Sequence, residues 1–337
     1  MIIGLHRVAA GRPTPRSAPP PPPPDEPNPS RWDSHAAYQF AAGGTRYLFS
    51  KLSTRLAVLA QFGLYGEAPV SLSRPFLAVV GFNGRMADTR HLLNHLSADG
   101  RNGGCIYYLQ GDRVYGDADL SQPLPADWTD SRAKVFQLVP QHRQQSPEVT
   151  AQQLQFALKT IERVTGSATV DVAAHSMGGL GARLYSSQGG QGIGKLMMVG
   201  TPNQGIRAAT MANWAIKSGI GFAMKLGGLG PDAGPALDWL QAISDGNPKL
   251  QQLNSRWSQD KQQLEKVMVL GSTGRLTSQA CPQEWGPGDG LVDSDSLCLQ
   301  DTPSKLLPGT WSQGHVSLMN DRESFRTMTS FFEWTPG

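Results

Sequence analysis

The chain of 337 residues is 39% hydrophobic and carries 30 basic against 27 acidic side chains, a formal net charge of +3. This length and apolar content favour one large domain with insertions over two separate domains. Because the lysines and arginines are scattered rather than clustered, we expect no nucleic-acid partner. The chain has no run of about eighteen apolar residues, so we expect no transmembrane segment.

The N-terminal region is rich in proline. Six prolines in succession at residues 19–24 predict an extended polyproline II segment that cannot pack into a core. We therefore expect a disordered tail over residues 1–30, and the apolar spacing that follows predicts a helical extension over residues 31–70. The apolar stretch at the start is too short for a clear secretory signal, which leaves the localisation open between the cytoplasm and export through a non-standard leader.

The first strand is predicted by a continuous apolar run at residues 76–80, which a glycine-containing turn follows at residues 81–84. Residues 88–96 have the spacing of a helix. Residues 104–117 predict a β-hairpin, which we expect to be an insertion at the rim of the functional site. Cys105, at the start of this hairpin, has the pattern of a small core residue.

Strands and helices then alternate. Apolar runs predict strands at residues 135–139, 196–199 and 267–270, and apolar residues at helical spacing predict a helix over residues 147–164. This alternation indicates an α/β fold built on a doubly wound, mostly parallel sheet, with functional residues at the carboxyl ends of the strands.

Residues 169–185, TVDVAAHSMGGLGARLY, combine an apolar strand, a sharp turn and a helix. Ser176 lies at the turn between small residues, which permit the strained backbone of a nucleophile elbow. The usual elbow sequence is G-x-S-x-G, and here Ala174 takes the first glycine position while Gly178 keeps the second. The alternative interpretation is an ordinary Ser-Gly turn between two core elements.

The segments AHSMGG and LGARLY, together with GTPNQG at residues 200–205, resemble the α/β-hydrolase superfamily and, within it, the bacterial triacylglycerol lipases and esterases. The resemblance spans roughly residues 74–332 and implies a catalytic domain over residues 71–337. It also implies an oxyanion hole made of two backbone amides, those of Phe82 and Met177. The family's first oxyanion turn usually reads His-Gly-x-x-Gly; Val80 replaces the histidine, which an amide donor does not require.

The resemblance implies a Ser, acid, His order for the catalytic residues. His315 is the only histidine after the elbow and is the candidate base. His175 is expected to be a poor base, because neighbouring side chains diverge at a turn. The segment GDGLV resembles the acid loop of these lipases and makes Asp289 the preferred acid, with Asp293 and Asp295 as alternatives.

The same acidic cluster could be a calcium loop. Some related lipases carry a calcium-binding aspartate two residues after the catalytic histidine, and here that position is Ser317, so we predict no metal and no cofactor. Cys281 and Cys298 flank the cluster, and a disulfide between them is a further hypothesis for an oxidising compartment.

Residues 205–245 are apolar and carry many glycines, in the position where lipases of this family insert a lid. A helical lid is therefore expected, with Trp214, Phe222 and Met224 as candidate contacts for the acyl chain. The alternative is an ordinary helical cap with the same residues in its core.

These features together predict a serine ester hydrolase that cleaves lipid esters, similar to a triacylglycerol lipase, through an acyl-enzyme. A short-chain carboxylesterase, a phospholipase and an acyltransferase remain alternatives, and a non-catalytic binding module is less favoured. The expected partners are a lipid or ester substrate and, peripherally, a lipid surface. We expect a monomer.

Overall fold

A computed structural model describes residues 64, 66–206, 209, 233–278, 285–309 and 313–337 of the chain. The predicted tail, nearly all of the N-terminal extension and the interior of the predicted lid lie outside these residues. So do four single residues for which predictions were made: Trp214, Phe222, Met224 and Cys281.

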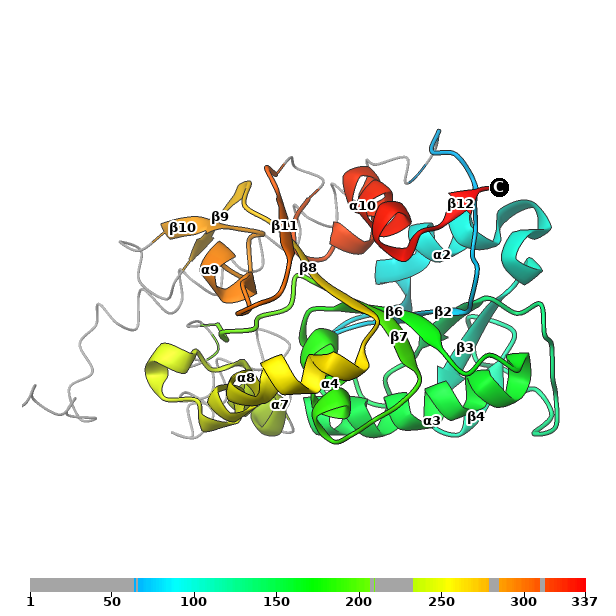
Figure 1. Cartoon of the computed structure of the whole chain (residues 1–337), viewed down its shortest axis with the longest axis horizontal. Coiled ribbons are helices and arrows are strands. Elements are labelled where there is room, and N and C mark those ends of the chain that lie inside the picture. The colour runs from blue at the N-terminus through cyan, green and yellow to red at the C-terminus, as the bar shows by residue number, and fades with distance from the viewer. Residues whose placement is uncertain (1–63, 65, 207–208, 210–232, 279–284, 310–312) are drawn as a thin grey trace, which may run out of the picture.

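An eight-stranded sheet with the order β11-β8-β7-β6-β2-β5-β3-β4 forms the centre of the structure (Figure 1). All neighbouring strands pair in parallel except β3 and β4, which are antiparallel. The predicted doubly wound, mostly parallel sheet is therefore confirmed. Its strands are β2 (Phe76–Val79), β3 (Ile106–Gln110), β4 (Arg113–Tyr115), β5 (Val135–Leu138), β6 (Val170–His175), β7 (Ile193–Val199), β8 (Lys266–Ser272) and β11 (Ser304–Leu307).

Helices cover both faces of the sheet (Figure 1). Successive residues of β2 point to opposite faces: Leu77 and Val79 join one hydrophobic core, whereas Phe76 and Ala78 join the other. Being buried on both sides explains why the central strands are continuous apolar runs. The first core is closed by α3 (Pro147–Thr165), α4 (Met177–Ser187) and α8 (Pro248–Asp260), and the second by α2 (Arg90–Ser97) and α10 (Arg322–Phe332).

Smaller elements complete the described structure. Two antiparallel pairs lie outside the central sheet: β1 (Val70–Ser71) with β12 (Thr335–Pro336), and β9 (Arg275–Ser278) with β10 (Trp285–Gly288). The short helices are α7 (Gly234–Leu240), α9 (Ser294–Leu297), η1 (Met86–Thr89), η2 (Ala98–Gly103), η4 (Ile243–Asp245), η5 (Lys261–Gln263) and η6 (Leu318–Asn320). The β9-β10 hairpin was not predicted from the sequence.

The hairpin expected at residues 104–117 forms, but it is part of the central sheet rather than an insertion. Its first strand, β3, pairs in parallel with β5, so the hairpin makes the edge of the central sheet. Cys105 is exposed rather than in the core, because it precedes β3, just after the turn at Gly103 and Gly104.

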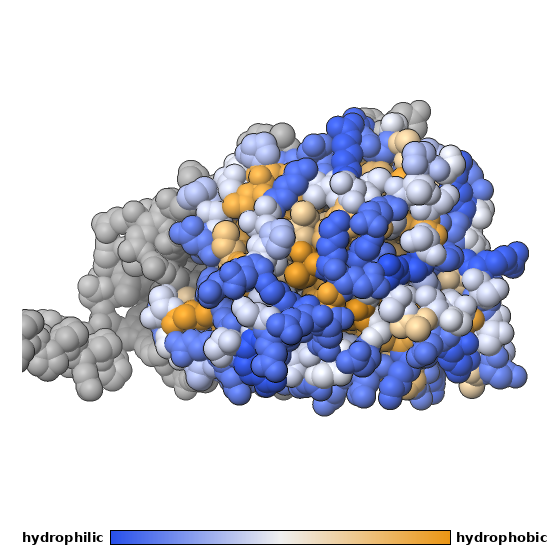
Figure 2. All heavy atoms as spheres, viewed as in Figure 1, coloured by the Kyte–Doolittle hydropathy of each residue, from blue (hydrophilic) through white to orange (hydrophobic). Residues whose placement is uncertain are grey.

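The visible surface carries mostly hydrophilic residues, with apolar residues in patches between them (Figure 2). Within the described chain, Phe156 on α3 is the one large apolar side chain that stands out into solvent, with 41% of its surface exposed. None of the described helices combines the length and the apolar character needed to cross a bilayer.

Candidate active site

Ser176 occupies the sharp turn between β6 and α4. Its backbone has φ 55° and ψ −132°, a conformation that non-glycine residues rarely adopt. Its N–H donates to the carbonyl of Val199 at 2.8 Å, which ties the turn to the neighbouring strand β7. A Cβ on Gly178 would lie 2.9 Å from the carbonyl oxygen of Val80, so this position has no room for a side chain.

Three side chains form a continuous hydrogen-bonded chain at the carboxyl ends of the strands. Ser176 Oγ lies 2.9 Å from His315 Nε2, and His315 Nδ1 lies 2.7 Å from Asp289 Oδ2. All three residues are buried. Ser176 follows β6, Asp289 follows the β9-β10 hairpin, and His315 follows β11, so the sheet and its connecting loops bring together residues that are far apart in the chain.

The carboxylate of Asp289 is fixed by its own loop. Its second oxygen, Oδ1, accepts the backbone N–H groups of Leu291 at 3.0 Å and Val292 at 2.8 Å. The backbone N–H of His315 donates to the Asp289 carbonyl at 2.9 Å, which adds a main-chain link between the two residues. These hydrogen bonds hold the carboxylate against the imidazole.

The two alternative acids lie elsewhere. Asp293 is the N-cap of α9 and accepts the N–H of Ser296 at 2.8 Å, while Asp295 is exposed. In the described parts of the chain, no group of three or more His, Cys, Asp or Glu side chains is arranged to hold a metal ion.

The two predicted oxyanion donors lie around Ser176. Gly81, just before Phe82, packs directly on the elbow: a Cβ there would lie 2.6 Å from Ser176 Cβ and 2.9 Å from the Met177 nitrogen. Among the described residues, neither the Phe82 nor the Met177 N–H has a hydrogen-bond acceptor within the protein. Met177 also begins α4, where the helix dipole favours negative charge.

Asn83 holds the predicted oxyanion turn in place. Its backbone is left-handed, with φ 56°, and its N–H donates to the carbonyl of Arg143 at 2.6 Å. Arg143 Nη2 returns a hydrogen bond to the Asn83 carbonyl at 3.1 Å. The loop between β5 and α3 therefore fixes the two peptide groups that follow Phe82.

The GTPNQG turn lies against Asp289 and His315. A Cβ on Gly200, which has φ 60°, would lie 3.2 Å from both Asp289 Oδ2 and His315 Nδ1. A side chain here would press on the bond between these two atoms, and the positive φ also favours glycine. This constraint involves residues distant in sequence, so the motif alone did not reveal it.

Arg183, whose role the sequence did not indicate, is fully buried on α4 and links this helix to the loop after β7 and to α8. It donates to Asn203 Oδ1 at 2.9 Å and to Asn254 Oδ1 at 2.7 Å, and its guanidinium lies 4.8 Å from the centre of the Trp257 ring. Asn203 in turn donates to the carbonyl of Leu297 at 2.8 Å, at the end of α9. Burial lowers the Arg183 pKa to about 9.

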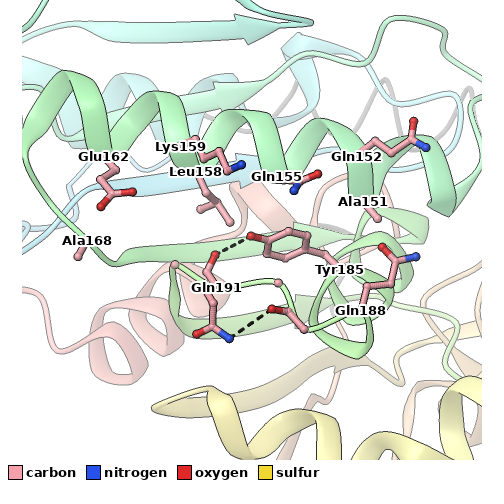
Figure 3. A pocket seen from close by; sticks show the side chains of 13 residues that line it. Ala151, Gln152, Gln155, Leu158, Lys159, Glu162, Ala168, Tyr185, Gln188 and Gln191 are labelled. Atoms are coloured by element: carbon pink, nitrogen blue, oxygen red, sulfur yellow. Dashed lines mark hydrogen bonds between the residues drawn. The ribbon is translucent and has the colours of Figure 1, made fainter.

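A separate hollow of about 500 Å³ lies at the other end of α4 (Figure 3). It is bounded by α3 and by the glycine-rich loop before β7, where Tyr185 Oη donates to the Gln191 carbonyl at 2.6 Å. Because Ser176 precedes the first residue of α4 and the hollow surrounds its last turn, this hollow is not the candidate active site.

No protein-family model matches the sequence, and a search of curated proteins finds no relative. Solved structures do match. The product of the gene lin2722 from Listeria innocua is 15% identical with a TM-score of 0.50, and the match covers 77% of this chain and 94% of that one. The mature lipase BlEst2 of Bacillus licheniformis is 14% identical with a TM-score of 0.50, over 79% and 94% of the two chains. The chain has the α/β-hydrolase fold.

The form of BlEst2 with its propeptide is also similar to this chain, at 15% identity and a TM-score of 0.53, over 81% of this chain and 54% of the other. Identities this low describe the fold and leave the substrate open. Within that fold, the Ser176 turn and the Asp289 and His315 loops lie at the carboxyl ends of the strands, where open α/β sheets bind ligands.

Proposed function

We propose that the protein is a serine ester hydrolase. The observation that carries the proposal is the chain of hydrogen bonds from Ser176 Oγ to His315 Nε2 at 2.9 Å and from His315 Nδ1 to Asp289 Oδ2 at 2.7 Å. A serine hydroxyl becomes a good nucleophile when an imidazole accepts its proton, and the carboxylate stabilises the imidazolium that results.

The reaction then runs in two halves. Ser176 Oγ attacks the ester carbonyl while His315 Nε2 takes its proton, and the Phe82 and Met177 amides donate to the oxyanion. The intermediate collapses, His315 returns the proton to the leaving alcohol, and the acyl group stays on Ser176. Water, deprotonated by His315, attacks the acyl-enzyme and releases the acid, after which Ser176 regains its proton.

For the substrate we propose lipid esters, as for a triacylglycerol lipase. Support comes from the lipase-like sequence motifs and from the apolar composition of residues 205–245, which we propose as the lid. Trp214, Phe222 and Met224 are the proposed acyl contacts. A short-chain carboxylesterase, a phospholipase and an acyltransferase are the alternatives to be separated by experiment.

The decisive test is labelling with a fluorophosphonate, followed by mass spectrometry of the modified peptide. We expect a single adduct on Ser176, and Ser176→Ala should remove both the adduct and the turnover of a p-nitrophenyl ester, by at least about 10³-fold. Turnover that persists in the folded variant would disprove the assignment.

Substrate class is tested on a series of esters of increasing acyl length. Each buried CH₂ contributes ~0.8 kcal/mol, so a lipase should prefer chains beyond about eight carbons. Preference for acetate or butyrate would favour a carboxylesterase, and ester formation with an added alcohol would favour an acyltransferase.

A further inference from the structure

His175 is the last residue of β6 and precedes Ser176, yet its side chain contacts the main chain of His315, the candidate base. Its Nε2 lies 2.7 Å from the main-chain carbonyl oxygen of His315, and the two imidazole rings have centres 4.7 Å apart. The side chain is buried. The sequence indicated only that His175 is a poor base, and it left the residue without a role.

The main chain of His315 depends on such contacts. His315 lies in a turn between β11 and η6, where no strand or helix ladder holds it. Its N–H donates to the Asp289 carbonyl at 2.9 Å, and its C=O receives the hydrogen bond from His175. The two bonds hold the backbone of the base from opposite sides, one from the acid loop and one from the elbow.

We propose that His175 is a positioning residue that holds His315 in line with Ser176 by donating a hydrogen bond from Nε2–H to the His315 carbonyl. The inference rests on the proposed serine-hydrolase function and adds a residue to it. His175 and Ser176 are adjacent, so the same turn that presents the nucleophile also fixes the distance to its base.

The protonation of His175 suits this role. A carbonyl only accepts, so Nε2 carries the proton. Burial, and then the nearby charge of His315, lower the His175 pKa to about 3, although Asp289 and the hydrogen bond oppose the shift. His175 is therefore uncharged at neutral pH. A positive charge at 4.7 Å would oppose formation of the His315 imidazolium during the reaction.

Two substitutions of similar size separate the donor from the bulk of the ring. Glutamine places an amide N–H near the position of the imidazole Nε2, whereas methionine fills the space without a donor. His175→Met should lower kcat at least about tenfold, which corresponds to about 1.4 kcal/mol, with KM within about twofold of wild type. His175→Gln should recover most of that loss.

A spectroscopic signature reports the positioning directly. The proton between His315 Nδ1 and Asp289 should give a downfield proton resonance in the wild type and in His175→Gln, and it should broaden or disappear in His175→Met. His95→Met is the matched control. His95 lies on α2, away from the site, and its Nε2 makes a similar contact with the Ala68 carbonyl at 3.2 Å. This variant should leave kcat and the resonance unchanged.

The outcomes are distinct. If wild type takes no fluorophosphonate on Ser176, the proposed function fails. If wild type is labelled but folded His175→Met keeps kcat within about twofold, or His175→Gln is as slow as His175→Met, the positioning role is overturned. Should both variants fail to fold, the nitrogen chemical shifts of His175 in wild type decide: a neutral Nε2–H tautomer supports the role, and an Nδ1–H tautomer or a charged ring overturns it.

Discussion

Gly81 and Ser176 are in such close contact that a Cβ on Gly81 would lie 2.6 Å from the Cβ of Ser176. The oxyanion turn and the elbow therefore pack backbone to backbone. The same Cβ would lie 2.7 Å from the carbonyl oxygen of His175. This oxygen belongs to the backbone, so it cannot move aside as the end of a flexible side chain could. The position of the Phe82 amide relative to Ser176 follows from this contact.

Gly81→Ala should displace the oxyanion turn and lower kcat by about 10²-fold, the effect of removing one donor from an oxyanion hole. Ester turnover measures the loss, and circular dichroism verifies the fold. Gly234→Ala is the matched control, because a Cβ at Gly234 meets nothing within 4 Å. Equal activity of the two variants would show that the packing at Gly81 does not set the geometry of the hole.

Asp289→Asn should lower kcat by about 10³-fold or more, because an amide cannot stabilise the imidazolium and can hold the wrong tautomer of His315. Asp293→Asn is the control within the same loop. Asparagine caps a helix as well as aspartate does, so α9 and the activity should be retained. If Asp293→Asn were the slower variant in kcat/KM measurements, the acid would have to be reassigned.

Arg183→Met should lower the free energy of unfolding by about 3 kcal/mol, since it leaves the buried oxygen of Asn203 and the partly buried oxygen of Asn254 without their donor. Urea unfolding measures the change. Arg113→Met is the control on β4, because Arg113 and its partner Asp112 are both exposed and their ion pair is 3.8 Å long, so the effect should stay below about 0.5 kcal/mol. Similar losses in the two variants would contradict a structural role specific to Arg183.

Asp171 should make stability depend on pH. Burial raises its pKa from 3.8 to about 6, although Arg74 and Lys195 act in the opposite direction. Between these two pH values the folded protein holds a proton that the unfolded chain has released, so stability falls as pH rises through this window. The unfolding free energy of wild type minus that of Asp171→Asn should decrease by about 1–3 kcal/mol from pH 3.8 to 6. A difference that stays constant with pH would show that the Asp171 pKa is not raised.

Much of the fold could be predicted from local pattern. The buried strands β2, β5, β6 and β7 are continuous apolar runs, and α3 begins with a proline and ends at a left-handed glycine, Gly166. Such signals depend on neighbours in the chain and on burial of both sheet faces. The place of the β3-β4 hairpin was predicted wrongly, because strand pairing partners are chosen by contacts that no local pattern contains.

The candidate site divides in the same way. Ser176 could be singled out by the small residues that its strained turn requires, and His315 because it is the only histidine after the elbow. The sequence by itself thus determined which residue types were available for the chemistry and which strands carry them.

Only the tertiary structure decided which of three neighbouring acids lies against His315, and that His175 supports its main chain from the opposite side. Ser176 and His315 are 139 positions apart in the chain. Their separation in space is set by the register of the parallel sheet and by a glycine at position 200 that leaves room for the bond between Asp289 and His315. Contacts of this kind arise from packing across the whole domain, so no periodicity in the sequence encodes them.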